Sequence, residues 1–447
     1  MHYCTIATLI LGAAGPLAAQ TLTLRDALRR ADQGAYANRI ARGSARAEAA
    51  RAAGALRGIL PTGRVEAAWL RTTNPVGAFG ITLQQRAVTA AAFNPATLNY
   101  PAPTGDVAGG LVLELPLINA DAWLGRSAAT SGSAAADASA RWTGASTQVE
   151  VVRAYYGTLL AAGKVTTLEA AVRAARDHVR AAEALFANGL ATRSDALLAS
   201  VQAGQLDADL AGARADVTLA HAGLAVLLGA PDSAFVLPAS LPDAERVRAI
   251  GARPPEPGAS ADGRADLDAA RWGLEAARAD RRRAGAALLP RLNAFARYDW
   301  HAASAVFGGK PMWTTGLMAS WSPFSGGAEL ADGRAAAARL DAARAAAEAA
   351  GAQARLDIVR RDADVSVAQQ RLTIAETGLA QSTEAHRLVA RRYESGLAPV
   401  VELLDAAAIE TRARLNEAAA RYDLIVATAA RLQANGQSLL PLDSLDR

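Results

Sequence analysis

The chain has 447 residues, of which 51% are hydrophobic and only 5% aromatic, and its formal net charge is +4. Alanine is abundant, and Arg rather than Lys carries the positive charge, a composition typical of long helices. Arg and acidic residues are interleaved instead of gathered in blocks, as on solvated helix faces. This pattern excludes a nucleic-acid-binding patch.

The N-terminus has the features of a secretory signal peptide over residues 1–19. Residues 5–19 form an apolar run that ends in small residues and is too short to span a membrane. Cleavage near Ala19 would remove Cys4, the only cysteine, so we expect no disulfide or thiolate metal site in the mature chain. Beyond the signal peptide we expect no helix long and apolar enough to cross a membrane.

Prolines divide the remaining chain into blocks. None lies between Pro116 and Pro231, or between Pro323 and Pro399. Because proline breaks helices, these blocks are predicted to hold long helices, and their Ala, Leu and Val residues recur at helical spacing. A single helix over 327–391 would be on the order of 100 Å long, which excludes a compact globule.

The two halves of the sequence resemble each other. Similar segments are 110–123 with 316–330, and 185–200 with 392–407. Gly110 and Gly316 are 206 positions apart, while Gly189 and Gly396 are 207 apart. A nearly constant offset between distant landmarks indicates an internal duplication rather than chance similarity.

We predict two repeats, each with a helix, a strand pair and a helical hairpin. The repeats are expected at 22–230 and 261–437, with an equatorial or linker segment at 231–260 and a C-terminal tail at 438–447. Strands are expected at about 63–73, 107–118, 291–301 and 313–323, and hairpins at about 125–229 and 327–436. The first repeat has about 23 extra residues between its strands, in a loop over 73–106.

The predicted strands alternate apolar and polar residues, which gives each strand two different faces. A soluble antiparallel sheet shows the same alternation, but strand length, a signal peptide and aromatic residues near strand ends favour membrane strands. The expected interface aromatics are Trp69, Tyr298, Trp300, Trp313 and Trp321. Four strands cannot close a barrel, and lipid does not tolerate an open sheet edge. Several chains must therefore share one barrel.

The repeated turn motifs, strand pairs and proline-free helices resemble the TolC-like outer membrane efflux protein family over roughly 22–437. The resemblance implies a mainly α-helical fold with a small β part. Each chain of a homotrimer would give four strands to a 12-stranded outer-membrane β-barrel, which a long periplasmic α-helical barrel continues.

The function implied by this resemblance is a passive exit duct in the outer membrane of a Gram-negative bacterium, serving tripartite efflux or type I secretion. Its partners would be a periplasmic adaptor (membrane fusion) protein, an inner-membrane pump of RND or ABC type, and outer-membrane lipid, with no nucleic acid. The residues do not choose between drugs, metal ions and proteins as cargo.

The resemblance also assigns a periplasmic constriction to the helical tips. Glu402 and Asp405 share one helix face, and three copies would form carboxylate rings that favour cations. Asp195 is the matching acid of the first tip, and Tyr393 matches a tyrosine that helps to hold the closed state. From the residues alone, Glu402 is also explained as an acid near a helix N-terminus. Ala398 replaces a basic residue of the best-known members, so we expect a differently connected latch.

Two short turn motifs resemble the sites where adaptors of this family dock: Gly189–Leu190 and Gly396–Leu397. Glycine at a turn between antiparallel helices has a purely structural explanation as well.

No catalytic set is visible in the sequence. The histidines lack metal-ligand spacing, and there is no Walker, GxGxxG or GxSxG motif. His178 and His386 are expected to be exposed or lumenal side chains on helices. We therefore predict a protein that is not an enzyme and has no cofactor and no metal. The main alternative to the channel is a soluble periplasmic coiled-coil adaptor or scaffold.

Overall fold

The computed structural model describes residues 21–232, 234–253 and 263–446. The predicted signal peptide lies outside them, as do residues 233 and 254–260 of the predicted linker. The chain forms two compact units. The first contains Met1–Gly43, Ala138–Asp268 and Ala350–Arg447, and the second contains Ser44–Asp137 and Ala269–Ala349.

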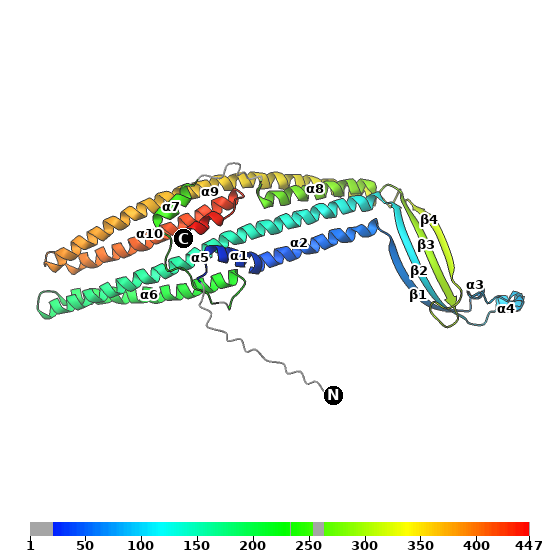
Figure 1. Ribbon diagram of the computed structural model, residues 1–447, viewed down its shortest axis with the longest axis horizontal. Coiled ribbons are helices and arrows are strands. Elements are labelled where there is room, and N and C mark those ends of the chain that lie inside the picture. The colour runs from blue at the N-terminus through cyan, green and yellow to red at the C-terminus, as the bar shows by residue number, and fades with distance from the viewer. Residues whose placement is uncertain (1–20, 233, 254–262, 447) are drawn as a thin grey trace, which may run out of the picture. The chain divides into compact units, whose positions relative to one another are not determined.

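Four long helices form two hairpins, as Figure 1 shows. The first hairpin consists of α5 (Ala120–Ala187) and α6 (Arg193–Leu227), and the second of α9 (Ala328–Glu394) and α10 (Val400–Ala434). α6 and α10 have 35 residues each, while α5 and α9 have 68 and 67. The starts of α6 and α10 are 207 positions apart, the same offset as their turn glycines. The duplication in the sequence is therefore a duplication of structure.

The remaining elements are shorter. They are α1 (Leu24–Gly34), α2 (Tyr36–Gly54), η1 (Ala55–Gly58), β1 (Thr62–Thr72), α3 (Pro75–Gln84), η2 (Ala90–Phe93), α4 (Pro95–Asn99), β2 (Thr104–Ile118), α7 (Ala244–Ala252), α8 (Ala265–Ala286), β3 (Arg291–Ala302), β4 (Met312–Ser320) and η4 (Leu440–Asp446). The extra residues of the first repeat form α3, η2 and α4. β4 ends at Ser320, so Trp321 follows the strand instead of lying in it.

The second unit holds a four-stranded antiparallel sheet in the order β1-β2-β3-β4. The prediction of four strands per chain in a mainly helical protein is confirmed. Pro116 lies in the inner strand β2, where its missing N–H would interrupt a ladder. It lies beyond Glu114, the last residue that pairs with β1, and next to a register shift against β3. This position explains how the proline is accommodated.

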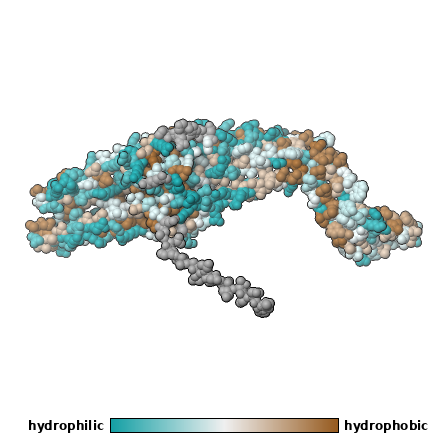
Figure 2. Space-filling model, viewed as in Figure 1, coloured by the Kyte–Doolittle hydropathy of each residue, from teal (hydrophilic) through white to brown (hydrophobic). Residues whose placement is uncertain are grey.

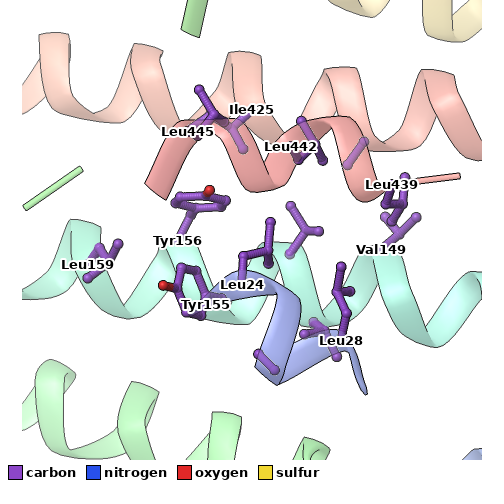
Figure 3. Close-up of a cluster of buried hydrophobic side chains, with 14 of the residues drawn as sticks. Leu24, Leu28, Val149, Tyr155, Tyr156, Leu159, Ile425, Leu439, Leu442 and Leu445 are labelled. Atoms are coloured by element: carbon purple, nitrogen blue, oxygen red, sulfur yellow. The ribbon is translucent and has the colours of Figure 1, made fainter. Parts of the chain in front are cut away.

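The first unit has its main hydrophobic core where α1, α5, α10 and η4 meet (Figure 3). Tyr155 and Tyr156 of α5 are fully buried there. The Tyr155 hydroxyl lies 2.8 Å from an Asp446 carboxylate oxygen, and the Tyr156 hydroxyl lies 3.1 Å from the other. The segment predicted as a C-terminal tail thus contributes η4 and its buried Leu442 and Leu445 to the core.

One helix departs from the expectation that no segment after the signal peptide is apolar enough to span a membrane. α6 is long and apolar enough by composition, and only 22% of its most apolar window is buried within the chain. A single helix of this kind is weak support for a span, because many alanines and leucines in an exposed helix give the same result.

Candidate functional site

The sheet has one apolar face that runs across all four strands. Val65, Leu111, Tyr298 and Trp313 lie in one row, because Val65 pairs with Leu111, Leu111 with Tyr298, and Tyr298 with Trp313. All four side chains are exposed, Trp313 by 72%. Figure 2 shows hydrophobic residues gathered over the strands. A soluble sheet would bury such a face against a core, so this face needs an apolar environment outside the chain.

The opposite face of the sheet carries charged side chains. Arg64 lies 3.2 Å from Glu114, and Arg297 lies 2.7 Å from Asp299 and 3.6 Å from Glu66. Near the loop end of the sheet, His301 Nδ1 lies 2.6 Å from an Asp106 carboxylate oxygen. An apolar outer face and a polar inner face are the pattern of a membrane β-barrel wall.

The predicted interface aromatics fall at two levels of the sheet. Trp69, Tyr298, Trp300 and Trp313 lie toward the end where β1 leads into α3 and where the β3–β4 turn lies. Trp321 follows the other end of β4, and its indole N–H donates to the Leu288 carbonyl at 3.0 Å. The strand between Trp313 and Trp321 is about 26 Å long at about 3.3 Å per residue, close to the height of the apolar band in such barrels.

Both outer strands of the sheet have an open edge. Among the described residues, β1 pairs only with β2, and β4 pairs only with β3. Eleven residues of β1 and nine of β4 therefore present unpaired backbone groups on one side. Such edges are templates for pairing with another strand.

The hairpin tips of the first unit have the same backbone geometry. Gly189 and Gly396 have φ of +74° and +71°, and an added Cβ would meet nothing within 4 Å at either position. These glycines are needed for their left-handed backbone, which closes α5 and α9 with Schellman-type hydrogen bonds. The next residues, Leu190 and Leu397, are 76% and 72% exposed. Each tip thus presents one apolar side chain to solvent.

The acids of the two tips occupy the same helix position but make different contacts. Asp195 is the third residue of α6, where it forms a capping box with Thr192: its carboxylate accepts from the Thr192 backbone N–H at 3.0 Å. Glu402 is the third residue of α10, but the cap there is Pro399. Proline has neither a hydroxyl nor a backbone N–H, so it cannot form this box. The Glu402 carboxylate is therefore available for other partners.

Glu402 is paired with a residue that the sequence analysis did not select. Arg392 Nη1 lies 3.3 Å from Glu402 Oε2, and Arg392 Nη2 donates to the Leu397 carbonyl at 3.3 Å. Asp405 is exposed and has no ion-pair partner among the described residues. Ala398, which stands where a basic residue was expected, is buried. Arg392 supplies the cation of this tip from the preceding helix.

Tyr393 of the second hairpin lies within electrostatic reach of Asp195 of the first. Burial raises the pKa of the Tyr393 hydroxyl, and the negative charge of Asp195 raises it further. The tyrosine of one tip and the acid of the other are therefore near enough for the charge of Asp195 to act on the Tyr393 hydroxyl. The role of these residues in a constriction stays a prediction.

His178 and His386, which we expected to be exposed or lumenal side chains, are both half-buried and lie close together. Their ring centroids lie 6.4 Å apart, and the Nε2 atoms of both rings are buried. The two residues are 208 positions apart, close to the offset of the duplication. That offset was the one signal in the sequence that could have paired them.

Comparison with known proteins agrees with the sheet and the hairpins described above. A family model described as outer membrane efflux protein matches residues 83–230 and 257–437. No curated protein matches the chain. Among solved structures, the outer membrane protein VceC from Vibrio cholerae is 22% identical with a TM-score of 0.76, and the match covers 93% of this chain and 96% of that one.

Two further solved structures are similar over nearly their whole length. CusC has a TM-score of 0.79 at 16% identity, covering 97% of this chain and 100% of that one. The MtrE outer membrane channel of Neisseria gonorrhoeae has a TM-score of 0.73 at 20% identity, covering 94% and 90%. The fold is therefore shared over nearly the whole chain.

Proposed function

Because the chain belongs to the outer membrane efflux protein family, we propose that three copies of it assemble into one channel. The family places it in the outer membrane of a Gram-negative bacterium as an efflux channel that extends into the periplasm, as the sequence analysis predicted. This membership sets aside the soluble adaptor or scaffold. The family is one of channels rather than enzymes.

The observation that carries the assembly is the sheet with two open edges and one apolar face. In lipid, every backbone N–H and C=O must be paired within protein, and only closed barrels achieve this with strands. Joining β4 of one copy to β1 of the next pairs both edges. Three copies then give twelve strands, with the row of Val65, Leu111, Tyr298 and Trp313 toward lipid and the charged face toward the pore.

At the tips, Glu402 and Asp405 of three copies would line a constriction. The cap at Pro399 supports this role for Glu402, because it leaves the carboxylate uncommitted to its own helix. Rings of carboxylates attract cations and repel anions. Arg392 partly neutralises Glu402, and that pair holds the turn through the Leu397 carbonyl.

The exposed leucines at the tips fit the docking of a periplasmic adaptor. Leu190 and Leu397 project from equivalent turns, and apolar anchors at the centre of an interface carry much of its binding energy. In this proposal the channel is a passive duct. An inner-membrane pump of the RND or ABC type, linked through the adaptor, drives export.

Planar bilayer recordings test the proposal. We expect purified protein to form channels that prefer K⁺ over Cl⁻, and the double change Glu402→Gln with Asp405→Asn to move the permeability ratio toward one. Glu384→Gln is the matched control, since Glu384 is an exposed acid of the same hairpin that pairs with Arg387. Absence of channels overturns the channel assembly, while channels with unchanged selectivity overturn only the carboxylate constriction.

A further inference from the structure

We propose that His178 and His386 form a binding site for a late first-row transition-metal dication such as Zn²⁺. The two residues come from α5 and α9, one from each hairpin, and both line one cavity of about 450 Å³ among α5, α6, α9 and α10. The cavity lies inside the first unit. This proposal does not depend on the trimer or on the constriction.

The unsatisfied atoms of this cavity are imidazole nitrogens. His178 Nε2 and His386 Nε2 are both buried and have no hydrogen-bond partner among the residues that the structure describes. Buried polar atoms are nearly always paired, and an orphan on one ring could reflect packing alone. Two orphans of the same kind on neighbouring rings that line one cavity indicate a shared ligand that accepts two nitrogen donors.

The surroundings of His386 fix which of its nitrogens is free. Its Nδ1 lies 2.5 Å from Glu410 Oε2, and Glu410 also accepts from Thr383 Oγ1 at 3.0 Å and from Arg414. When the Glu410 carboxylate accepts a hydrogen bond from Nδ1–H of the neutral ring, the lone pair available to a ligand is on Nε2. A carboxylate behind a ligating histidine is the usual second shell of a metal site, where it orients the ring and raises its basicity.

The ring separation is compatible with a shared ion after a small adjustment. With metal–nitrogen distances of about 2.0–2.1 Å, two imidazoles on one ion have centroids roughly 5 to 6 Å apart. The observed 6.4 Å thus requires the two rings to approach each other by roughly 0.4–1.4 Å.

The donor set selects the class of ion. Within the cavity the protein offers two imidazole nitrogens, because Glu410 is already bonded to His386, Thr383 and Arg414, so water would complete the coordination of a bound ion. Imidazole suits Zn²⁺, Ni²⁺ and Cu²⁺, whereas Mg²⁺ and Ca²⁺ require oxygen ligands. A bound ion would link the first hairpin to the second and stabilise their contact.

The test is isothermal titration of Zn²⁺ into the purified full-length protein in detergent, with Mg²⁺ as the cation control. We expect one Zn²⁺ per chain, no binding of Mg²⁺, and a rise in melting temperature with Zn²⁺. His178→Gln and His386→Gln should each abolish stoichiometric binding. Glu410→Gln should weaken it by about tenfold to hundredfold, as second-shell changes do.

Matched controls are His221→Gln and His301→Gln. His221 Nε2 lies 3.0 Å from the Phe235 carbonyl oxygen and His301 Nδ1 lies 2.6 Å from Asp106, and neither residue lines the cavity. If a cavity variant fails to fold, Co²⁺ absorption of the unchanged protein still reports nitrogen ligands directly. Zinc binding that survives in the His178→Gln, His386→Gln double variant would overturn the proposal. The proposal would also be overturned if the histidines of the unchanged protein took up protons in a titration but the protein bound no Zn²⁺.

Discussion

Arg392 Nη1 and Glu402 Oε2 lie 3.3 Å apart across the turn of the second hairpin. The pair joins the last turn of α9 to the first turn of α10, and it exists because Pro399 cannot draw Glu402 into a capping box. The first hairpin, with Thr192 at the same place, uses its acid for the cap instead. The change of cap from Thr192 to Pro399 therefore makes Asp195 part of a helix cap and leaves Glu402 available to a pore.

Removing the arginine should expose the charge of Glu402. Arg392→Gln is expected to increase cation selectivity in planar bilayers, because three carboxylates lose their neutralising partners. Both side chains are about half exposed, so the loss of folding stability should stay below about 1 kcal/mol. Arg387→Gln breaks a comparable pair with Glu384 farther from the turn and should leave selectivity unchanged. Equal selectivity in the two variants would contradict a pore role for Arg392.

Restoring the missing cap should have the opposite effect. Pro399→Thr creates the sequence Thr-Val-Val-Glu, which matches the capping box of the first hairpin in spacing. We expect the helix to be stabilised by about 0.5–2 kcal/mol, and the Glu402 side chain to turn toward the cap, which lowers cation selectivity. Thr192→Ala should destabilise the first hairpin by a similar amount. Thermal unfolding measures the changes in stability, and bilayer recording measures the change in cation selectivity. A Pro399→Thr variant less stable than the parent would refute the account of the cap.

Two glycines with the same backbone conformation should respond differently to alanine. Gly396 has open space around it, so Gly396→Ala should cost only the left-handed conformation, about 1–2 kcal/mol. At Gly229, with φ of +72°, an added Cβ would lie 2.1 Å from the Gly34 carbonyl oxygen. Gly229→Ala should therefore lose on the order of 4 kcal/mol or more. Similar melting temperatures for the two variants would show that this contact is not rigid.

The C-terminal segment should be needed for a stable first unit. Asp446 accepts the Leu24 backbone N–H at 2.7 Å and lies within hydrogen-bond distance of the Tyr155 and Tyr156 hydroxyls. Asp446→Ala should cost about 2–4 kcal/mol, because the Leu24 N–H and the Tyr156 hydroxyl lose their acceptor, while the Tyr155 hydroxyl keeps the Leu22 carbonyl at 3.0 Å. Ser444→Ala loses only a local bond to Pro441 and is the control. Circular dichroism melting in detergent compares them, and equal melting temperatures would contradict the anchoring role.

Sequence periodicity was sufficient for the parts of the fold that repeat. Alternation in the strands, proline-free blocks and the offset of 207 between Gly189 and Gly396 are local signals, so the four strands and the family could be predicted. Side-chain contacts between helices carry a weaker signal, which for His178 and His386 was only their offset of 208 positions. The pairing of Arg392 with Glu402, and the meeting of His178 with His386, depend on how helices pack. Residues 438–447 were predicted only as a C-terminal tail, because their four leucines, interrupted by Pro441, form no periodic pattern.

The two faces of the sheet should tolerate charge very differently. Leu317 lies on the apolar face and its neighbour Met318 on the opposite one, and both are exposed in the single chain. Leu317→Arg should prevent insertion or destabilise the barrel by about 2–4 kcal/mol per copy near the membrane centre. Met318→Arg should insert normally. Heat-modifiable migration of the assembled protein distinguishes them, and equal behaviour would contradict the assignment of the lipid face.

The shared barrel is tested most directly by disulfide cross-linking between β1 and β4 of different copies. In a background without Cys4, one version of the chain carries single cysteines along β1 and a second carries them along β4, and the two are expressed together. We predict disulfides between the versions, and a chain with both cysteines should give a ladder that ends at three copies. Absence of β1–β4 links between copies, or a ladder that continues past three, would contradict the account.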